Sequence, residues 1–224
     1  MAEGGGKRRR RMEVAEEYEL AARPNRSRIE DVSEATWITR KQVAILQQPR
    51  GKVLQTMGHM AGDDGAARQW QLLPEEALFM VQQGLLAMRN EKEARAMAVT
   101  EAMDRVFSGG MSPFFFHAYA KIRDAGFVAA RAEGNFHGRP LLHVWKPELS
   151  KKWRKSQPSF VMGVVRCSES LSSSSCEELV RLQSRSNCPL RMAMVDDSFA
   201  VTFFDVHPNP DTSGAAGNPS CEFP

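Results

Sequence analysis

The sequence lacks the marks of several protein classes. No stretch approaches the ~18 consecutive apolar residues of a transmembrane helix, so we expect no membrane partner. Arginines, rather than an apolar run, follow the first residues, so we expect no secretory signal peptide. The GxGxxG, P-loop and GxSxG signatures are also missing, and no internal repeat is visible. These absences point away from membrane proteins and from common nucleotide-dependent enzymes.

Cysteine is scarce, and its spacing carries no metal signature. The four cysteines are Cys167, Cys176, Cys188 and Cys221, and no two of them form a CxxC pair. No two histidines stand four positions apart. We therefore predict no metal and no cofactor. Without a secretory signal, the cysteines are expected to be free thiols in a reducing compartment.

Charge is nearly balanced over the whole chain but not along it. The net charge of +3 does not mark a nucleic-acid-binding protein. However, a basic run from Lys7 to Arg11 stands near the N-terminus. Such a run is typical of a nuclear localisation signal or a nucleic-acid patch, and equally of a solvated disordered tail.

The composition allows a folded core, and the sequence pattern divides the chain into four parts. Apolar residues make up 42% of the chain, which is enough for a core in one large or two small domains. We predict an α+β protein with a basic disordered tail at 1–33, a helical N-terminal domain at 34–108, an α/β domain at 109–207 and a disordered tail at 208–224.

The helical prediction for the N-terminal domain depends on three segments. Thr36–Gln48 is interpreted as a helix with apolar contacts such as Trp37. Pro74 occupies the first position of a second helix, whose apolar face is predicted to run through Met88. A third helix is predicted over Glu91–Phe107.

The pattern changes in the second half of the chain. Ser112 and Pro113 predict the start of a helix, and Gly126 predicts its end. The strands that follow should form a mixed sheet with a final hairpin; they are predicted at Phe127–Arg131, Pro140–Trp145, Phe160–Cys167, Leu190–Val195 and Phe199–Val206.

Histidines are the first candidates for catalysis near neutral pH. A stand-alone, metal-free ribonuclease could use His117 or His143 together with Lys121. On the predicted helix, however, His117 and Lys121 share a face while Tyr119 points away. No motif therefore supports this alternative, and structural roles are expected for the histidines.

A basic loop with one aromatic residue separates two of the predicted strands. Lys151, Lys152, Arg154 and Lys155 surround Trp153. Cations contact phosphates, and an aromatic ring can stack on an unpaired base. We predict that these five residues bind RNA; the alternative is a solvated loop that is anchored by its tryptophan.

Three segments together resemble a known family. They are GKVLQTMG (51–58), LLPEEALFMVQQGLL (72–86) and FFFHAYAKIRDAGFVAAR (114–131). These segments resemble the larger non-catalytic, structural subunit of the eukaryotic tRNA-splicing endonuclease. The final hairpin, LRMAMVDDSFAVTFFDV, is similar to the endonuclease fold that all four subunits of that enzyme share. The resemblance spans residues 37–206 and implies a packing and recognition role for the octapeptide GKVLQTMG.

The resemblance also implies that the chain has no catalytic site. Catalytic subunits of the family cleave RNA with a tyrosine, a histidine and a lysine, without metal. At the corresponding places this chain has no tyrosine within Glu133–Trp145, has Gln157, Pro158 and Ser159 instead of the histidine, and has Asn187, Cys188 and Pro189 instead of the lysine. Proton transfer needs a positioned donor and acceptor, so the resemblance implies a scaffold subunit.

Partners and location follow from the same resemblance. It implies a nuclear heterotetramer with catalytic and other structural subunits, which binds pre-tRNA. The last strand, with Phe199, Val201 and Phe203 on one face, could pair across a subunit interface. Asp196 and Asp197 could insert into a basic pocket of another subunit, or form an ordinary turn. A general RNA-binding module on a degenerate nuclease fold remains a further alternative.

Overall fold

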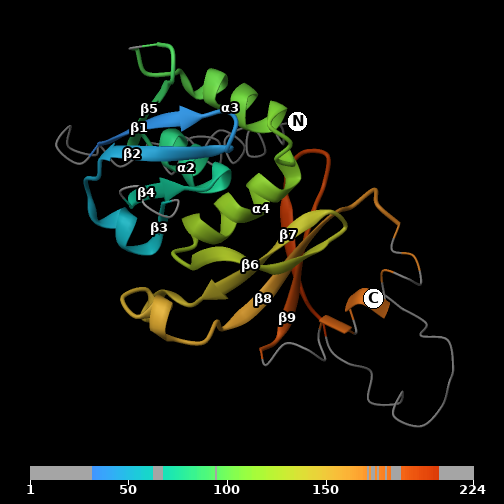
Figure 1. Ribbon diagram of the computed structural model, residues 1–224. Coiled ribbons are helices and arrows are strands. Elements are labelled where there is room, and N and C mark those ends of the chain that lie inside the picture. Colours follow the sequence, from blue (N-terminus) through green and yellow to red (C-terminus); the bar gives the residue numbers. More distant parts are fainter. Residues whose placement is uncertain are drawn as a thin grey trace, which may run out of the picture.

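The computed structural model describes residues 32–62, 68–93, 95–170 and 188–206, with isolated positions between 171 and 187. Both predicted tails, including the basic run near the N-terminus, lie almost entirely outside these ranges. The described chain is an α+β protein with two mixed sheets (Figure 1). The α+β prediction is therefore confirmed.

Five strands form the first sheet, in the order β3-β4-β2-β1-β5. They are β1 (Ser33–Ile38), β2 (Val43–Gln48), β3 (His59–Ala61), β4 (Gln69–Leu72) and β5 (Leu86–Asn90). β5 runs parallel to β1, whereas the other neighbouring strands are antiparallel. This sheet occupies the region that the sequence pattern assigned to a helical domain.

The prediction of a helical N-terminal domain was wrong. Thr36–Gln48, predicted as a helix, forms β1, a turn and β2. Burial alternates along β1, so that Ser33, Ala35 and Trp37 are buried and the residues between them are half-exposed. This two-residue period is that of a half-buried strand, and it overrides the helical spacing seen over the longer window.

Two helices accompany the first sheet, and both are shorter than predicted. α2 (Pro74–Gln82) has its proline at the first position, as predicted, but it ends before Gly84, whose φ is 67°. Met88 consequently lies in β5 rather than on the helix. α3 (Val99–Ser108) begins eight residues after Glu91, the start that the sequence pattern suggested.

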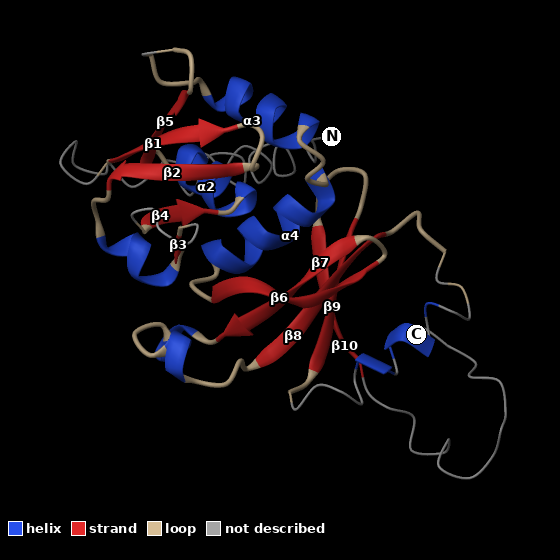
Figure 2. Ribbon diagram, in the orientation of Figure 1, coloured by secondary structure: helices blue, strands red, loops and turns tan. Residues whose placement is uncertain are grey.

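The second sheet has the order β10-β9-β8-β7-β6 (Figure 2). Its elements are α4 (Pro113–Asp124), β6 (Val128–Phe136), β7 (Arg139–Trp145), β8 (Phe160–Arg166), β9 (Leu190–Val195) and β10 (Val201–Val206), with short 3-10 turns η3 (Pro147–Leu149) and η4 (Trp153–Lys155) after β7. β8 and β9 are parallel, and the other pairs are antiparallel. The predicted mixed sheet and final hairpin are confirmed.

One hydrophobic cluster joins the two sheets. α4 lies between them in Figure 1, and it contacts α2 as well as strands β6, β8 and β9. The cluster includes Trp37 from β1, Tyr119 from α4 and Val164 from β8. A second cluster, which includes Phe136 and Leu190, covers other side chains of the second sheet. The domain boundary at 108/109 stays a prediction.

Candidate interface site

The octapeptide Gly51–Gly58 forms the 3-10 turn η2 (Lys52–Thr56) between two glycines with positive φ. Gly58, with φ of 69°, passes directly against β4. A Cβ atom at Gly58 would lie 2.3 Å from Nε1 of Trp70 and 2.8 Å from the carbonyl oxygen of Gln71. Only glycine fits both this backbone conformation and this close approach.

The buried carboxylate of Glu76 holds the end of the octapeptide. Oε1 of Glu76 accepts a hydrogen bond from the N–H of Gly58 at 2.9 Å, and Oε2 accepts one from the N–H of Leu73, also at 2.9 Å. Burial raises the pKa of Glu76 to about 7, although both N–H groups oppose this shift. The role of Glu76 was not predicted from the sequence; the available signal was a glutamate three residues after the N-cap Leu73, where it can accept from the N–H of that residue.

The basic loop of the second sheet reaches the same octapeptide. Nε1 of Trp153 donates to the carbonyl oxygen of Gln55 at 2.9 Å. The guanidinium of Arg154 donates to the same carbonyl at 3.1 Å and to that of Gly58 at 3.0 Å. Arg154 also lies between two indole rings, 4.4 Å from the centroid of Trp153 and 5.4 Å from that of Trp70. The octapeptide is therefore a packing segment between the two sheets.

The five residues predicted to bind RNA consequently fall into two groups. Trp153 and Arg154 use their side chains for contacts with the octapeptide. Lys151, Lys152 and Lys155 are exposed on the same loop. RNA binding by this loop stays a prediction, and the lysines are the members whose ammonium groups face solvent.

A groove of about 880 Å³ opens where the loop meets the first sheet. Its apolar lining includes Leu46, Leu54, Met60 and Trp70, and its cations are Arg68, Lys151 and Arg154. No acidic side chain is among the described residues that line it. We refer to it as the basic groove.

Two further polar contacts join the halves of the chain. Arg123 of α4 donates through Nη2 to Oγ1 of Thr56 in the octapeptide, at 2.8 Å. Arg131 of β6 makes a bidentate ion pair with Glu75 of α2, with both N···O distances at 2.7 Å. The Glu75 side chain is almost completely buried, so this charge-assisted pair fixes α2 against β6.

The tip of the final hairpin is held by its own polar contacts. Oδ1 of Asp196 accepts hydrogen bonds from the N–H and hydroxyl of Ser198 and from the N–H of Ala200, at 2.7–2.9 Å. These bonds, that of the Ser198 hydroxyl first, lower the pKa of Asp196. Asp197 instead pairs with Arg166 at 2.7 Å, and its side chain is 69% exposed. Asp196 therefore shapes the turn, while Asp197 presents its carboxylate to solvent.

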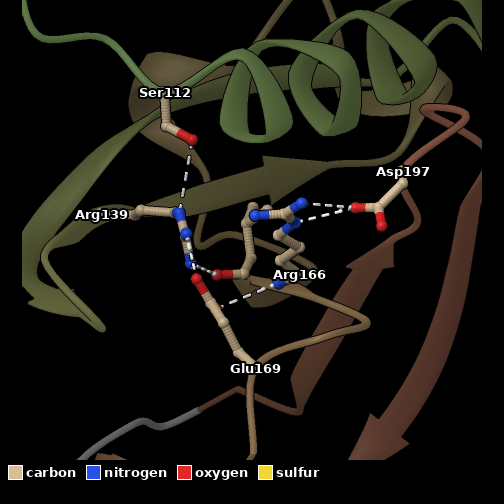
Figure 3. A network of polar contacts seen from close by, with 6 residues as sticks. Ser112, Arg139, Arg166, Glu169 and Asp197 are labelled. Carbon is tan, nitrogen blue, oxygen red and sulfur yellow. Dashed lines mark hydrogen bonds and ion pairs between the residues drawn. The ribbon is translucent and has the colours of Figure 1, made fainter.

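Figure 3 shows that this tip belongs to a wider polar network. Glu169 accepts from both Arg139 and the backbone N–H of Arg166, and it links β7 to β8. The hydrogen bond from Arg139 is the main cause that lowers the pKa of Glu169 to about 2. Arg139 also reaches the hydroxyl of Ser112 at 3.4 Å, so Ser112 does not cap α4 with its side chain.

Phe199, Val201 and Phe203 have different surroundings. Phe199 has a φ of 63°, lies in the loop before β10, and stacks on His117 of α4 with 4.3 Å between ring centroids. Val201 and Phe203 lie in β10 and pack in part against the main core. β10 ends the strand order, so its outer edge pairs with no strand among the described residues.

The alternative catalytic residues lie in different surroundings. His117 is stacked on Phe199, and burial lowers the pKa of His117 and of His143. Tyr119 is buried in the core, and burial raises its pKa well above the usual value. Lys121 is exposed on α4. Tyr119 and Lys121 thus lie on different faces of α4, as predicted.

The three positions compared with the family's catalytic residues lie at different places in the second sheet. The region Glu133–Trp145 covers the end of β6, the turn and β7. Gln157–Ser159 directly precedes β8, and Cys188 and Pro189 directly precede β9, whereas Asn187 lies outside the described residues. Within the described ranges, no three His, Cys, Asp or Glu side chains are grouped to hold a metal. No helix in those ranges is long and apolar enough to cross a membrane.

Residues 18–90 match the family model described as the N-terminal part of the tRNA-splicing endonuclease subunit Sen54. Over these residues, about a third of the chain, the sequence is similar to the Sen54 N-terminal region. This match confirms the resemblance to the Sen54 subunit over residues 18–90. No curated protein matches the chain.

The Sen54 match has a clear structural extent. It ends at Asn90, which is the last residue of β5, and it contains the octapeptide and Glu76. It also begins fourteen residues before residue 32, where the described fold starts. The second sheet, with its basic loop and final hairpin, lies beyond the match.

Proposed function

We propose that this Sen54-type chain is a structural subunit that scaffolds a catalytic partner and positions intron-containing pre-tRNA for cleavage at the splice sites. The observation that carries the proposal is the Sen54 match over residues 18–90. Direct contacts from Trp153 and Arg154 join that region to the second sheet. Such a subunit would work in the nucleus, within a heterotetramer.

The proposed subunit interface is the edge of the second sheet at β10. An edge strand offers unpaired N–H and C=O groups to a strand of another chain. Phe199, Val201 and Phe203 would form the apolar part of this surface. Asp197, with its exposed carboxylate, would contact a basic site on the partner, and Asp196 would hold the tip in shape.

The proposed pre-tRNA contact uses the exposed lysines of the basic loop. Changing Lys151, Lys152 and Lys155 together to glutamine should lower affinity for pre-tRNA and reduce the dependence of log K on log salt by about 2–3, since each neutralised phosphate contact contributes about 0.9. Trp153 and Arg154 stay unchanged because they hold the octapeptide. The matched control changes Lys41, Lys92 and Lys121, which are also exposed. An equal salt slope for both triple variants would exclude the loop as the contact.

The experiment that tests the function is affinity capture of the chain from nuclear extract. Intron-containing pre-tRNA is then added to the captured material and, separately, to the purified chain. We expect the captured material to cleave at both splice sites and the purified chain to leave the RNA intact. Cleavage by the purified chain would overturn the proposal in favour of a ribonuclease that uses His117 or His143. If neither sample cleaves, the scaffold function is wrong.

A further inference from the structure

The basic groove combines an apolar lining with cations that come from both sheets. Met60 on β3 is 50% exposed there, although it is a large apolar side chain. Arg68 lies just before β4, and Lys151 lies in the loop after β7. A segment that carries both carboxylates and apolar side chains would complement this surface.

The chain enters the first sheet at the rim of the same groove. Oγ of Ser33, at the start of β1, donates to the carbonyl oxygen of Arg50 at 2.9 Å. It also accepts from the N–H of Arg50 at 2.8 Å. Pro49 and Gly51, on either side of Arg50, line the groove. Ser33, where β1 begins, therefore lies beside the groove.

Those preceding residues contain a segment of the required chemistry. Residues 12–22 read MEVAEEYELAA, with glutamates at 13, 16, 17 and 19, no cation, and the apolar side chains of Val14, Tyr18 and Leu20. The Sen54 family model starts within this segment, at residue 18. We propose that residues 12–22 occupy the basic groove, with glutamates facing Arg68 and Lys151 and apolar side chains against Met60.

Length and tethering favour this occupant over a separate molecule. The connection from residue 22 to Ser33 can extend to about 35 Å, which is ample for a groove at its own exit point. A covalently tethered segment acts at an effective concentration of the order of millimolar, so even weak ion pairs and a small apolar contact keep it bound. This docking goes beyond the proposed function and does not depend on it; Lys151 is the one residue that both proposals use.

A photo-crosslinker on the full-length chain tests the docking without using RNA cleavage. Tyr18 is replaced by p-benzoylphenylalanine, and the crosslinked peptides are mapped by mass spectrometry. We expect crosslinks within one chain to Met60 and its neighbours in the groove. The matched control carries the same probe at Phe223, which should not label the groove.

A charge-reversed variant and two controls make the result decisive. Arg68→Glu with Lys151→Glu should lower the groove crosslinks about fivefold or more, because like charges would then face the glutamates. The melting temperature of this variant confirms that it folds. Crosslinks elsewhere, or crosslinks unaffected by the charge reversal, would overturn the docking. Crosslinks between chains would assign the groove to a second copy of the chain. Loss of the groove crosslinks when pre-tRNA is added, together with no effect of the charge reversal in its absence, would assign the groove to RNA. Either result would overturn the proposal.

Discussion

At the residue scale, the buried carboxyl group of Glu76 holds the end of the octapeptide Gly51–Gly58. Its pKa is raised from 4.5 to about 7, chiefly by burial. A carboxyl group whose folded-state pKa is raised contributes stability that is complete below about pH 4.5 and is lost as the pH rises through about 7. Glu76 should therefore make the protein less stable at about pH 8 than at about pH 5.

Replacing this carboxyl group should remove that part of the pH dependence. For Glu76→Gln, we expect the free energy of unfolding to lose about 2–3 kcal/mol of its change between about pH 5 and pH 8, as measured by urea unfolding. The variant should also be less stable near pH 5, because an amide oxygen cannot accept from both Gly58 and Leu73 as the two carboxyl oxygens do. The control is Glu91→Gln, an exposed residue. Parallel pH profiles for wild type and Glu76→Gln would refute the assignment.

A comparison of Gly58 with Gly84 distinguishes the cost of a strained backbone from the cost of a steric clash. Gly58 has φ of 69° and Gly84 has φ of 67°, but a Cβ atom has open space only at Gly84. Each alanine substitution should cost about 1 kcal/mol for the left-handed backbone. Gly58→Ala should cost roughly 2 kcal/mol more, because its methyl group meets Trp70 and the backbone of Gln71. Equal losses in urea unfolding would mean that the close contact with β4 is unimportant.

At the element scale, the two aspartates at the tip of the final hairpin have different roles. Asp196 accepts three hydrogen bonds within the turn, whereas Asp197 makes one exposed ion pair. Asp196→Ala should therefore lower the melting temperature clearly, and Asp197→Ala should change stability by at most ~0.5 kcal/mol. In the proposed assembly, Asp197→Ala should instead weaken capture of partner subunits. A stable Asp196→Ala chain, or unchanged capture by Asp197→Ala, would contradict this division.

The same scale shows which elements the sequence could predict. α4 was predictable because Pro113 begins it and Gly126, with φ of 84°, ends it; the N–H of Gly126 bonds to the carbonyl of Arg123. β1 and β2 were not, because their apolar residues also fit a helical spacing over the longer window. Pairing with β5 and β4 decides between the two, and those partners are distant in the sequence.

At the scale of the whole molecule, the candidate site depends on contacts that no local pattern encodes. Trp153 and Gln55 are 98 residues apart in the sequence, yet they share a hydrogen bond. The sequence indicated that the octapeptide and the basic loop each had a role. It could not show that Arg154 of the basic loop contacts Gly58 of the octapeptide, because neither segment carries a pattern that specifies its partner. Composition alone made all five loop residues equal candidates for RNA.

Arg154 is therefore expected to couple the two sheets. Arg154→Ala removes its hydrogen bonds to the carbonyl groups of Gln55 and Gly58 and its stacking between Trp70 and Trp153. We expect a loss of about 1–3 kcal/mol in unfolding free energy and faster hydrogen exchange at the N–H of Gly58. Lys155→Ala, in the same 3-10 turn, removes none of these contacts and should change neither quantity. If the two variants behave alike, the sheets are held together by the shared core around α4, and the octapeptide does not depend on the loop.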